Sequence, residues 1–428
     1  MTLDSRRSTT EQTQKRPFWL ILISQSLNAL ADALANAKTI LPWIMQSVGA
    51  PTFLTGLLVP IRESGSMLPQ VLMGHSIQRM AKRKVAYALG MVVQGLCVAM
   101  IALVASTLES VLAGITILGL VALLALARAV CSICSKDLIG KSIAKGQRGK
   151  LLGLSSSIAG AIALVTGGLI MANIITARSD LNYLLLVATA AWFAAAYTIM
   201  WLVESPSEPT EQKDTTTHLA KSIELFKTDT TFKRFVMVRA LLMGSGLSAP
   251  YLVLLSQPSA LIAQQSGAPI NAPINETINA VVTLGALIAL AGLASLISAS
   301  IWGRMADSNS KLTMQITGGL TTILCVLAAL AAVYFDSNTW LMLGLFFMLN
   351  VTHQGVRLAR KTYVADIAEG NLRTQYVATS NSAIGALLLV IGLLSAVIAQ
   401  WSIAIVLALF GLMAAYAIVV SRSLPTHT

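Results

Sequence analysis

Twelve apolar stretches dominate this sequence of 428 residues, and each is long enough to cross a lipid bilayer as one helix. A transmembrane helix needs about 20 mainly apolar residues. Because the bilayer core holds no water to bond backbone groups, we expect all of the stretches to be α-helices. They cover residues 18–45, 53–73, 85–106, 110–138, 151–176, 182–203, 232–257, 277–302, 312–335, 339–362, 375–399 and 401–421. The predicted fold class is an all-α membrane protein with twelve transmembrane helices.

The composition excludes other classes of protein. Charged residues make up 11% of the chain, against roughly 25% in a soluble domain. The mean hydropathy of +0.73 is too high for a chain whose whole surface faces water. A soluble enzyme, a disordered chain and a fibrous protein are therefore excluded. The net charge of +12 does not imply a nucleic-acid partner, because Lys and Arg accumulate in the cytoplasmic loops of membrane proteins.

The distribution of Lys and Arg predicts the topology. With the N-terminus inside, 25 of the 30 cations fall in inside segments, and only Arg178 falls in an outside loop. This asymmetry places both termini in the cytoplasm. The resulting division is an N-terminal tail, a six-helix bundle, a polar linker with one amphipathic helix around Leu219–Phe226, a second six-helix bundle and a C-terminal tail. These parts cover residues 1–17, 18–203, 204–231, 232–421 and 422–428.

The two halves repeat each other in parallel orientation. An offset of 229 aligns Gly74 and Lys82 after the second helix with Gly303 and Lys311 after the eighth. A second offset, 225, aligns the segments after the fourth and tenth helices, including Gly160 with Gly385. Gly160 and Gly167 are seven residues apart, so they share one face of the fifth helix and allow close packing there. Duplicated six-helix halves are an architecture of secondary transporters.

The loop after the second helix resembles the signature of the major facilitator superfamily, G-x-x-x-D-R-x-G-R-K/R. The first copy offers Gly74, Gln78, Arg79, Lys82 and Arg83, with Gln78 at the position of the Asp. The second copy keeps Gly303, Asp307 and Lys311. The resemblance covers essentially the whole chain. It implies that these loops form a charge network which holds the cytoplasmic side closed in the outward-open state.

Charged residues inside the predicted spans are costly, so each is a functional hypothesis. The first helix carries Gln25, Asn28, Asp32 and Asn36 at helical spacing, a polar stripe that we expect to face a cavity. Asp32 is the leading candidate for a proton-coupling or substrate-binding carboxylate; alternatively, it neutralises a neighbouring cation. The other charges inside the spans are Lys38, Arg62, Glu63, Arg128 and Arg239.

Depth along the helices suggests partners for these charges. Asp32 and Arg62 lie at similar depth, as do Glu63 and Arg128, although crossed pairing fits equally well. Such a pair could act as a gate, a proton relay or a structural contact. We expect Lys38 and Arg239 to extend toward the outer and inner surfaces respectively. We expect His353 to lie at the surface. The surplus of cations within the spans leans weakly toward an anionic substrate.

The predicted function is secondary active transport of a small solute by alternating access, with proton coupling through Asp32 or Glu63. The alternative is a non-transporting sensor or assembly factor on the same scaffold. No catalytic constellation, metal-ligand set or cofactor motif appears, and Gly140-Lys141-Ser142 lacks the upstream glycine of a P-loop. The expected partners are a small-molecule substrate, membrane lipid and a coupling proton, without ATP or nucleic acid. The expected location is the plasma membrane, which is the inner membrane of a bacterial cell.

Overall fold

The computed structural model describes residues 3–70, 73, 77, 80–143, 148–172, 178–204, 224–256, 274–334, 338–367 and 370–425. Within these ranges every regular element is a helix, and no strand occurs. Eight segments are long and apolar enough to cross a membrane, and the bent α14 brings the number to nine. Each of the twelve predicted spans overlaps a described helix, which is consistent with the predicted count. The amphipathic helix predicted in the linker lies partly outside the described residues, and its described part is helical over 224–228.

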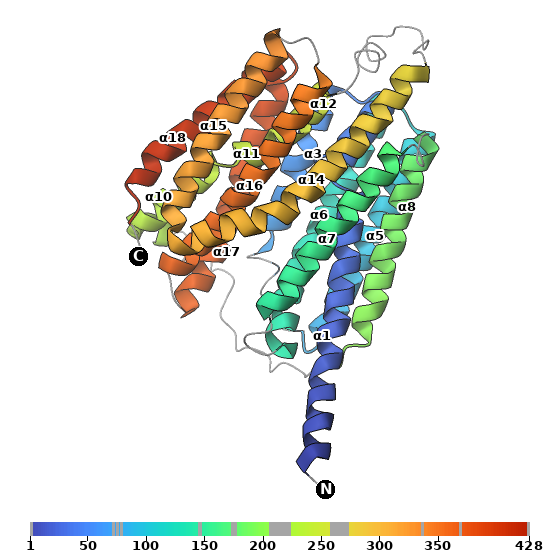
Figure 1. The fold of residues 1–428 in the computed structure, drawn as a ribbon, viewed down its shortest axis with the longest axis vertical. Helices are drawn as coiled ribbons and strands as arrows, with labels where there is room; N and C mark the ends of the chain where they lie inside the picture. The colour runs from blue at the N-terminus through green and yellow to red at the C-terminus, as the bar shows by residue number, and fades with distance from the viewer. Residues whose placement is uncertain are drawn as a thin grey trace.

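The helices form two adjacent bundles, which Figure 1 shows in blue to green and in yellow to red. The N-terminal half contains α1 (Leu3–Leu34), α2 (Ile40–Ser47), α3 (Thr52–Met67), α5 (Arg83–Thr107), α6 (Ser110–Ser142), α7 (Arg148–Met171) and α8 (Arg178–Met200). The C-terminal half contains α10 (Thr230–Leu241), α11 (Gly244–Leu247), α12 (Ala249–Leu255), α14 (Ile274–Ser308), α15 (Ser310–Tyr334), α16 (Thr339–Ile367), α17 (Gly370–Ile398) and α18 (Ile403–Arg422). We call the side where α1 begins and α18 ends the terminal end, and the other side the opposite end.

The first helix of each half is interrupted where the sequence predicts one continuous span. The range 18–45 breaks between α1 and α2, where the Asn36 side chain accepts a hydrogen bond of 2.8 Å from the backbone N–H of Lys38. Asn side chains compete with helical backbone bonds in this way. The seventh span breaks on either side of α11, at a segment that contains Gly244, Gly246 and Pro250. Glycine and proline both weaken a helix interior, so this break has a local cause.

The halves meet along two pairs of helices, α7 with α14 and α3 with α17. A Cβ on Gly167 would lie 2.4 Å from the backbone N of Ala289 and 2.5 Å from the carbonyl O of Gly285. The face predicted from the spacing of Gly160 and Gly167 is therefore packed against a partner helix: a Cβ on Gly160 would also meet α14, at Leu296. Backbones approach this closely only where side chains are absent.

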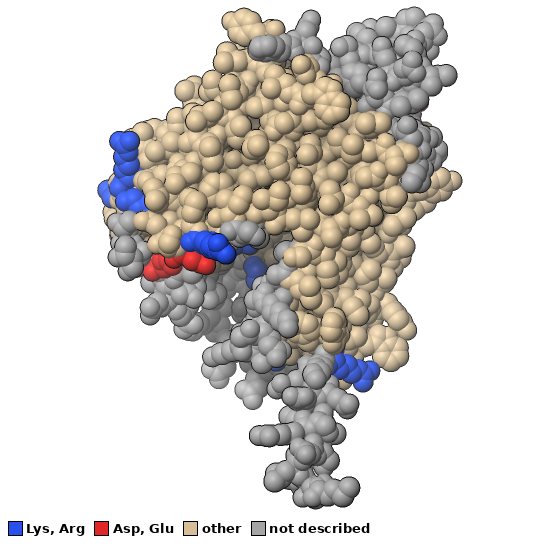
Figure 2. Space-filling model, in the orientation of Figure 1, with Lys and Arg blue, Asp and Glu red and all other residues tan. Residues whose placement is uncertain are grey.

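The contact between α3 and α17 runs from the opposite end to the middle of the molecule. A Cβ on Gly56 would lie 3.1 Å from the Cβ of Ala396, and one on Gly392 would overlap Pro60. Toward the terminal end, Asn381 donates a hydrogen bond of 3.3 Å to Gln70. Beyond this level Figure 2 shows a hollow between the halves, with Lys or Arg atoms inside it. The halves therefore touch at the opposite end and diverge toward the terminal end.

Candidate functional site

One carboxylate binds two guanidinium groups in the middle of the N-terminal half. Oδ1 of Asp32 on α1 accepts a hydrogen bond of 2.8 Å from Arg62 on α3, and it also accepts one from Arg128 on α6. The Arg62 side chain is 9% exposed, whereas that of Arg128 is 34% exposed. The pairing of Asp32 with Arg62 is thus formed. The pairing of Arg128 with Glu63 is not, because Arg128 binds Asp32 instead.

Glu63 faces a different cation. The charges that act most strongly on its carboxylate are Lys38 first, then Arg62 and Arg128. Lys38 was predicted to extend to the outer surface, but it does not. Its ammonium lies 3.4 Å from Nε2 of His353 on α16. The break between α1 and α2 explains this correction, because it ends the helix before Lys38 and lets the side chain turn toward the other half.

His353 connects the interrupted helices of the two halves. Its Nδ1 lies 2.9 Å from Oγ of Ser245 at the break between α10 and α12, while its Nε2 faces Lys38. Ser245 in turn donates to the carbonyl O of Leu242. Donation from Lys38 to Nε2 fits a tautomer with the proton on Nδ1, which then donates to Ser245. The expectation that His353 lies at the surface is therefore wrong, since the ring is wedged between halves.

Arg239 on α10 is also buried, at 7% exposure. The prediction that it extends to the inner surface is therefore wrong. Its guanidinium donates to Oγ of Ser380 at 2.8 Å and to Oδ1 of Asn381 at 2.7 Å, both on α17. Two neutral acceptors hold the cation within its own half. The Nε atom has no hydrogen-bond partner in the described part of the chain.

The rest of the predicted polar stripe on α1 is bonded inside the N-terminal half. Gln25 donates to Oγ of Ser135 on α6 at 2.7 Å, and Asn28 accepts from the indole N–H of Trp192 on α8 at 2.9 Å. Neighbouring helices, rather than the lining of an open cavity, supply the hydrogen-bond partners of both amides. The stripe was expected to face a cavity, whereas Gln25 and Asn28 are half-buried and bonded to neighbouring helices, and only Asp32 belongs to the charge cluster.

Arg357 and Arg360 on α16 belong to the same charge cluster as Asp32, Arg62, Glu63, Arg128 and Lys38. The predicted topology counts both arginines among the cations of the inside loops. Both act electrostatically on Lys38 and Glu63, across the boundary between the halves. The signal that could have found them is their spacing: His353, Arg357 and Arg360 are four and three residues apart, so they share one face of α16.

The terminal end of the N-terminal half holds a second polar network. Both carboxylate oxygens of Glu204 accept hydrogen bonds from the first turn of α5, at 3.0 Å from the N–H of Arg83 and 2.9 Å from that of Lys84. The Arg83 side chain pairs with Asp137 on α6, and Lys141 lies 2.8 Å from Asp137 and 3.5 Å from Glu204. Of the predicted gating residues, Arg83 takes part, Lys82 is exposed, and Gly74, Gln78 and Arg79 lie outside the described residues.

The C-terminal half repeats part of this network. Lys311, the second residue of α15, donates to the carbonyl O atoms of Arg422 and Leu424 at the end of α18. Lys84, the second residue of α5, donates in the same way to the carbonyl O atoms of Met200, the last residue of α8, and of Leu202. The structure therefore matches Lys311 with Lys84, not with Lys82 as the loop alignment suggested. Gly303 has open space around it, and Asp307 is exposed.

Glu204 should contribute measurably to stability, because it caps a helix whose first N–H groups have no helical acceptor. We expect Glu204→Ala to lower the free energy of unfolding by about 1–2 kcal/mol. Thermal unfolding in detergent measures the change. Glu224→Ala, which removes an exposed carboxylate, is the control and should leave the melting temperature unchanged. Equal melting of both variants would contradict the capping role.

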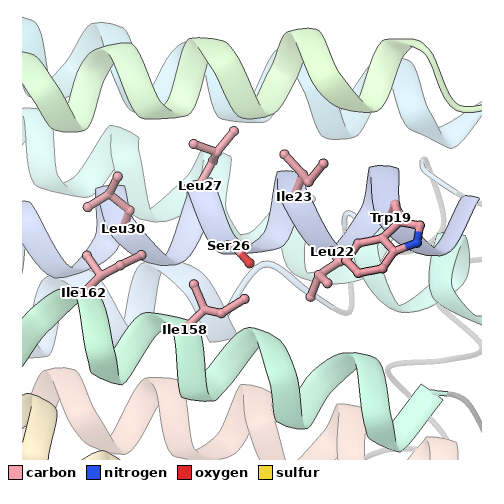
Figure 3. A pocket seen from close by; sticks show the side chains of 8 residues that line it. All are labelled: Trp19, Leu22, Ile23, Ser26, Leu27, Leu30, Ile158 and Ile162. Carbon is pink, nitrogen blue, oxygen red and sulfur yellow. The ribbon is translucent and has the colours of Figure 1, made fainter. Parts of the chain in front are cut away.

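A separate groove between α1 and α7 is apolar (Figure 3). Ser26 is the one polar side chain among the residues that line it, and the others are Trp19, Leu22, Ile23, Leu27, Leu30, Ile158 and Ile162. Such a lining suits an acyl chain and provides no charge to hold a polar solute. The chemistry of this chain is therefore concentrated in the charge cluster between the halves.

Comparison with known proteins identifies the fold. The family model described as Major Facilitator Superfamily matches residues 21–267, more than half of the chain. The chain belongs to the major facilitator superfamily. This membership confirms the resemblance drawn from the loop signature. A search of curated proteins finds no match.

Solved structures of two transporters of the major facilitator type share this architecture. The crystal structure of a D-xylose–proton symporter aligns with a TM-score of 0.69 and 13% identity, over 96% of this chain and 98% of that one. The nucleoside transporter NupG aligns with a TM-score of 0.64 and 12% identity, over 95% and 98%. At such low identity the likeness establishes the fold of this major facilitator protein, and its solute must be argued from its own residues.

Proposed function

We propose that this protein is a secondary active transporter that moves a small solute by alternating access. The observation that carries the proposal is the arrangement of the halves: they are in contact at the opposite end and separated by a hollow at the terminal end. The bundles 18–203 and 232–421 rock as units, joined by the linker 204–231. Both termini face the cytoplasm of a bacterial cell, so this state is open to the inside.

Proton coupling is assigned to the carboxylates of the cluster. A protonated Asp32 loses its attraction for Arg62 and Arg128, and a carboxylate that meets these cations again releases its proton. Glu63 stands in the same relation to Lys38. Because Lys38 contacts His353 across the boundary between halves, a change in the charge of Glu63 alters an interaction that holds the halves together.

The polar networks at the terminal end also fit an inward-open state. In the family pattern, the loop signatures close the cytoplasmic side in the outward-open state. Here Asp307 of the second copy is exposed and the Glu204 network lies within one half, which supports an inward-open state. The apolar groove between α1 and α7 is a place for membrane lipid.

A reversible cross-link tests alternating access. Gly56→Cys with Ala396→Cys joins the halves at the opposite end, where the two Cβ positions are 3.1 Å apart and small movements reach disulfide geometry. If the halves rock, a cross-linked protein no longer exchanges solutes in proteoliposomes, and reduction restores exchange. The pair Gly114→Cys with Ala50→Cys lies within one half at the same end, at 3.0 Å, and should leave exchange intact.

The same cross-link reports on coupling. Its rate of formation, taken relative to that of the pair Gly114→Cys with Ala50→Cys to correct for thiol ionisation, should change as the pH falls into the range where carboxylates take up protons, because protonation shifts the balance between the two states. Asp32→Asn with Glu63→Gln should abolish that pH dependence. A rate that is independent of pH and of every added solute would instead favour a non-transporting sensor on this scaffold. Persistence of the pH dependence in the double variant would exclude these carboxylates as the coupling groups.

A further inference from the structure

Cations outnumber carboxylates in the cluster between the halves. The positive groups are Lys38, Arg62, Arg128, Arg239, Arg357 and Arg360, whereas the negative groups are Asp32 and Glu63. These six cations exceed the two carboxylates by four, and the exposed Lys361 adds a further positive charge that interacts with Arg357, Arg360 and Arg239. Cations gathered between the halves without an equal number of carboxylates create a positive potential, so an arrangement of this kind attracts further negative charge.

The C-terminal half is the one that lacks negative charge within its predicted spans. The structure relates Asp137 on α6 to Asp366 on α16, because Asp137 binds Arg83 and Asp366 binds Ser310, each the first residue of the preceding helix. Arg128 and Arg357 each lie nine residues before these carboxylates, so they occupy corresponding positions on α6 and α16. Arg128 is neutralised by Asp32, but the six predicted spans of the C-terminal half contain no Asp or Glu at all.

Arg357 and Arg360 therefore lack an acidic partner within the spans of their own half. Within the described residues, Arg357 has a hydrogen bond of 3.3 Å to the neutral Gln354, and Arg360 is held near two further cations, Arg357 and Arg239. Glu63 of the other half is the carboxylate that acts on Arg360. Arg357 is exposed and Arg360 half-buried, so both guanidinium groups can be reached by a solute.

We infer that the transported solute is an anion, and that its carboxylate or phosphate group binds Arg357 and Arg360 at the place equivalent to that of Asp32 beside Arg128. This inference rests on the proposed transport function and adds the substrate class. Guanidinium groups bind planar carboxylates and phosphates through paired hydrogen bonds, which gives both charge neutralisation and orientation. The buried Arg239, with its unbonded Nε, adds to the positive potential beside this position.

Thermal stabilisation of the purified protein tests the substrate class, because a ligand that binds the folded state raises its melting temperature. The probes are succinate, citrate, glycerol 3-phosphate and inorganic phosphate, beside succinamide, glycerol and sodium chloride at equal ionic strength. We expect at least one anion to stabilise saturably and the neutral analogues not to. In Arg357→Gln with Arg360→Gln the apparent affinity should fall at least tenfold.

Two controls keep the result interpretable. Arg304→Gln removes an exposed cation at the end of α14, outside the cluster, and should bind like the wild type. The ligand-free double variant should melt close to the wild-type temperature, since the repulsion between cations that it loses offsets the hydrogen bond of Arg357 to Gln354 and the attraction of Arg360 to Glu63. Anions no better than sodium chloride, or an anion bound equally by the double variant, would overturn the inference. The cross-link between residues 56 and 396 reports separately whether the halves move, so a neutral substrate is distinguishable from the absence of transport.

Discussion

Asp32→Asn should be the most destabilising single change of charge in this protein. The asparagine keeps the shape of the side chain but removes the one carboxylate to which Arg62 and Arg128 both donate hydrogen bonds in the described part of the chain, and the Arg62 side chain is 9% exposed. Removing one partner of a buried ion pair costs about 3–5 kcal/mol, because the other charge stays buried and uncompensated. Thermal unfolding in detergent should show a large drop in melting temperature.

The control for this prediction is Asp307→Asn, which removes an exposed carboxylate and should have no measurable effect. Adding Arg128→Gln to Asp32→Asn should restore part of the lost stability, since one of the two orphaned cations is then removed. A double-mutant cycle separates this coupling from any loss of packing. Melting of Asp32→Asn at the temperature of Asp307→Asn would show that the carboxylate does not neutralise the two arginines.

The approximate positions of the helices along the chain followed from the sequence, because apolar length is a one-dimensional property. Asp32 and Arg62 form the pair that equal depth suggested. Rotation about each helix axis does not follow from depth. For that reason the sequence could not decide that Arg128 reaches Asp32 while Glu63 is left with Lys38.

The other differences between prediction and structure arise where one side chain hydrogen-bonds to the backbone. By average composition, residues 35–39 belong to one long apolar stretch, yet Asn36 bonds the backbone there and redirects Lys38. Glu204 was assigned to a linker by its polar neighbours, although its carboxylate caps α5. In both positions a single side chain that hydrogen-bonds to the backbone outweighs the average composition of the segment.

Gly167→Ala should disrupt the contact between α7 and α14 and clearly lower the stability of the protein. The added methyl group would lie 2.4 Å from the backbone N of Ala289, so relief requires movement of a whole helix. Overpacking of this kind costs about 1–3 kcal/mol, and contacts with backbone lie at the upper end of that range. Thermal unfolding measures the loss, and a lower rate of cross-linking between Gly56→Cys and Ala396→Cys would show that the halves have moved apart.

Gly168→Ala is the matched control, because the same chemical change is made one residue further along the same helix. A Cβ at Gly168 has open space around it, and alanine in place of glycine stabilises a helix by about 0.5–1 kcal/mol. The two variants share every effect of helix propensity and differ only in what the methyl group meets. If both changed stability alike, the close approach of α7 and α14 would not be required. If only Gly167→Ala is destabilised, the contact between the halves depends on the close approach of the α7 and α14 backbones.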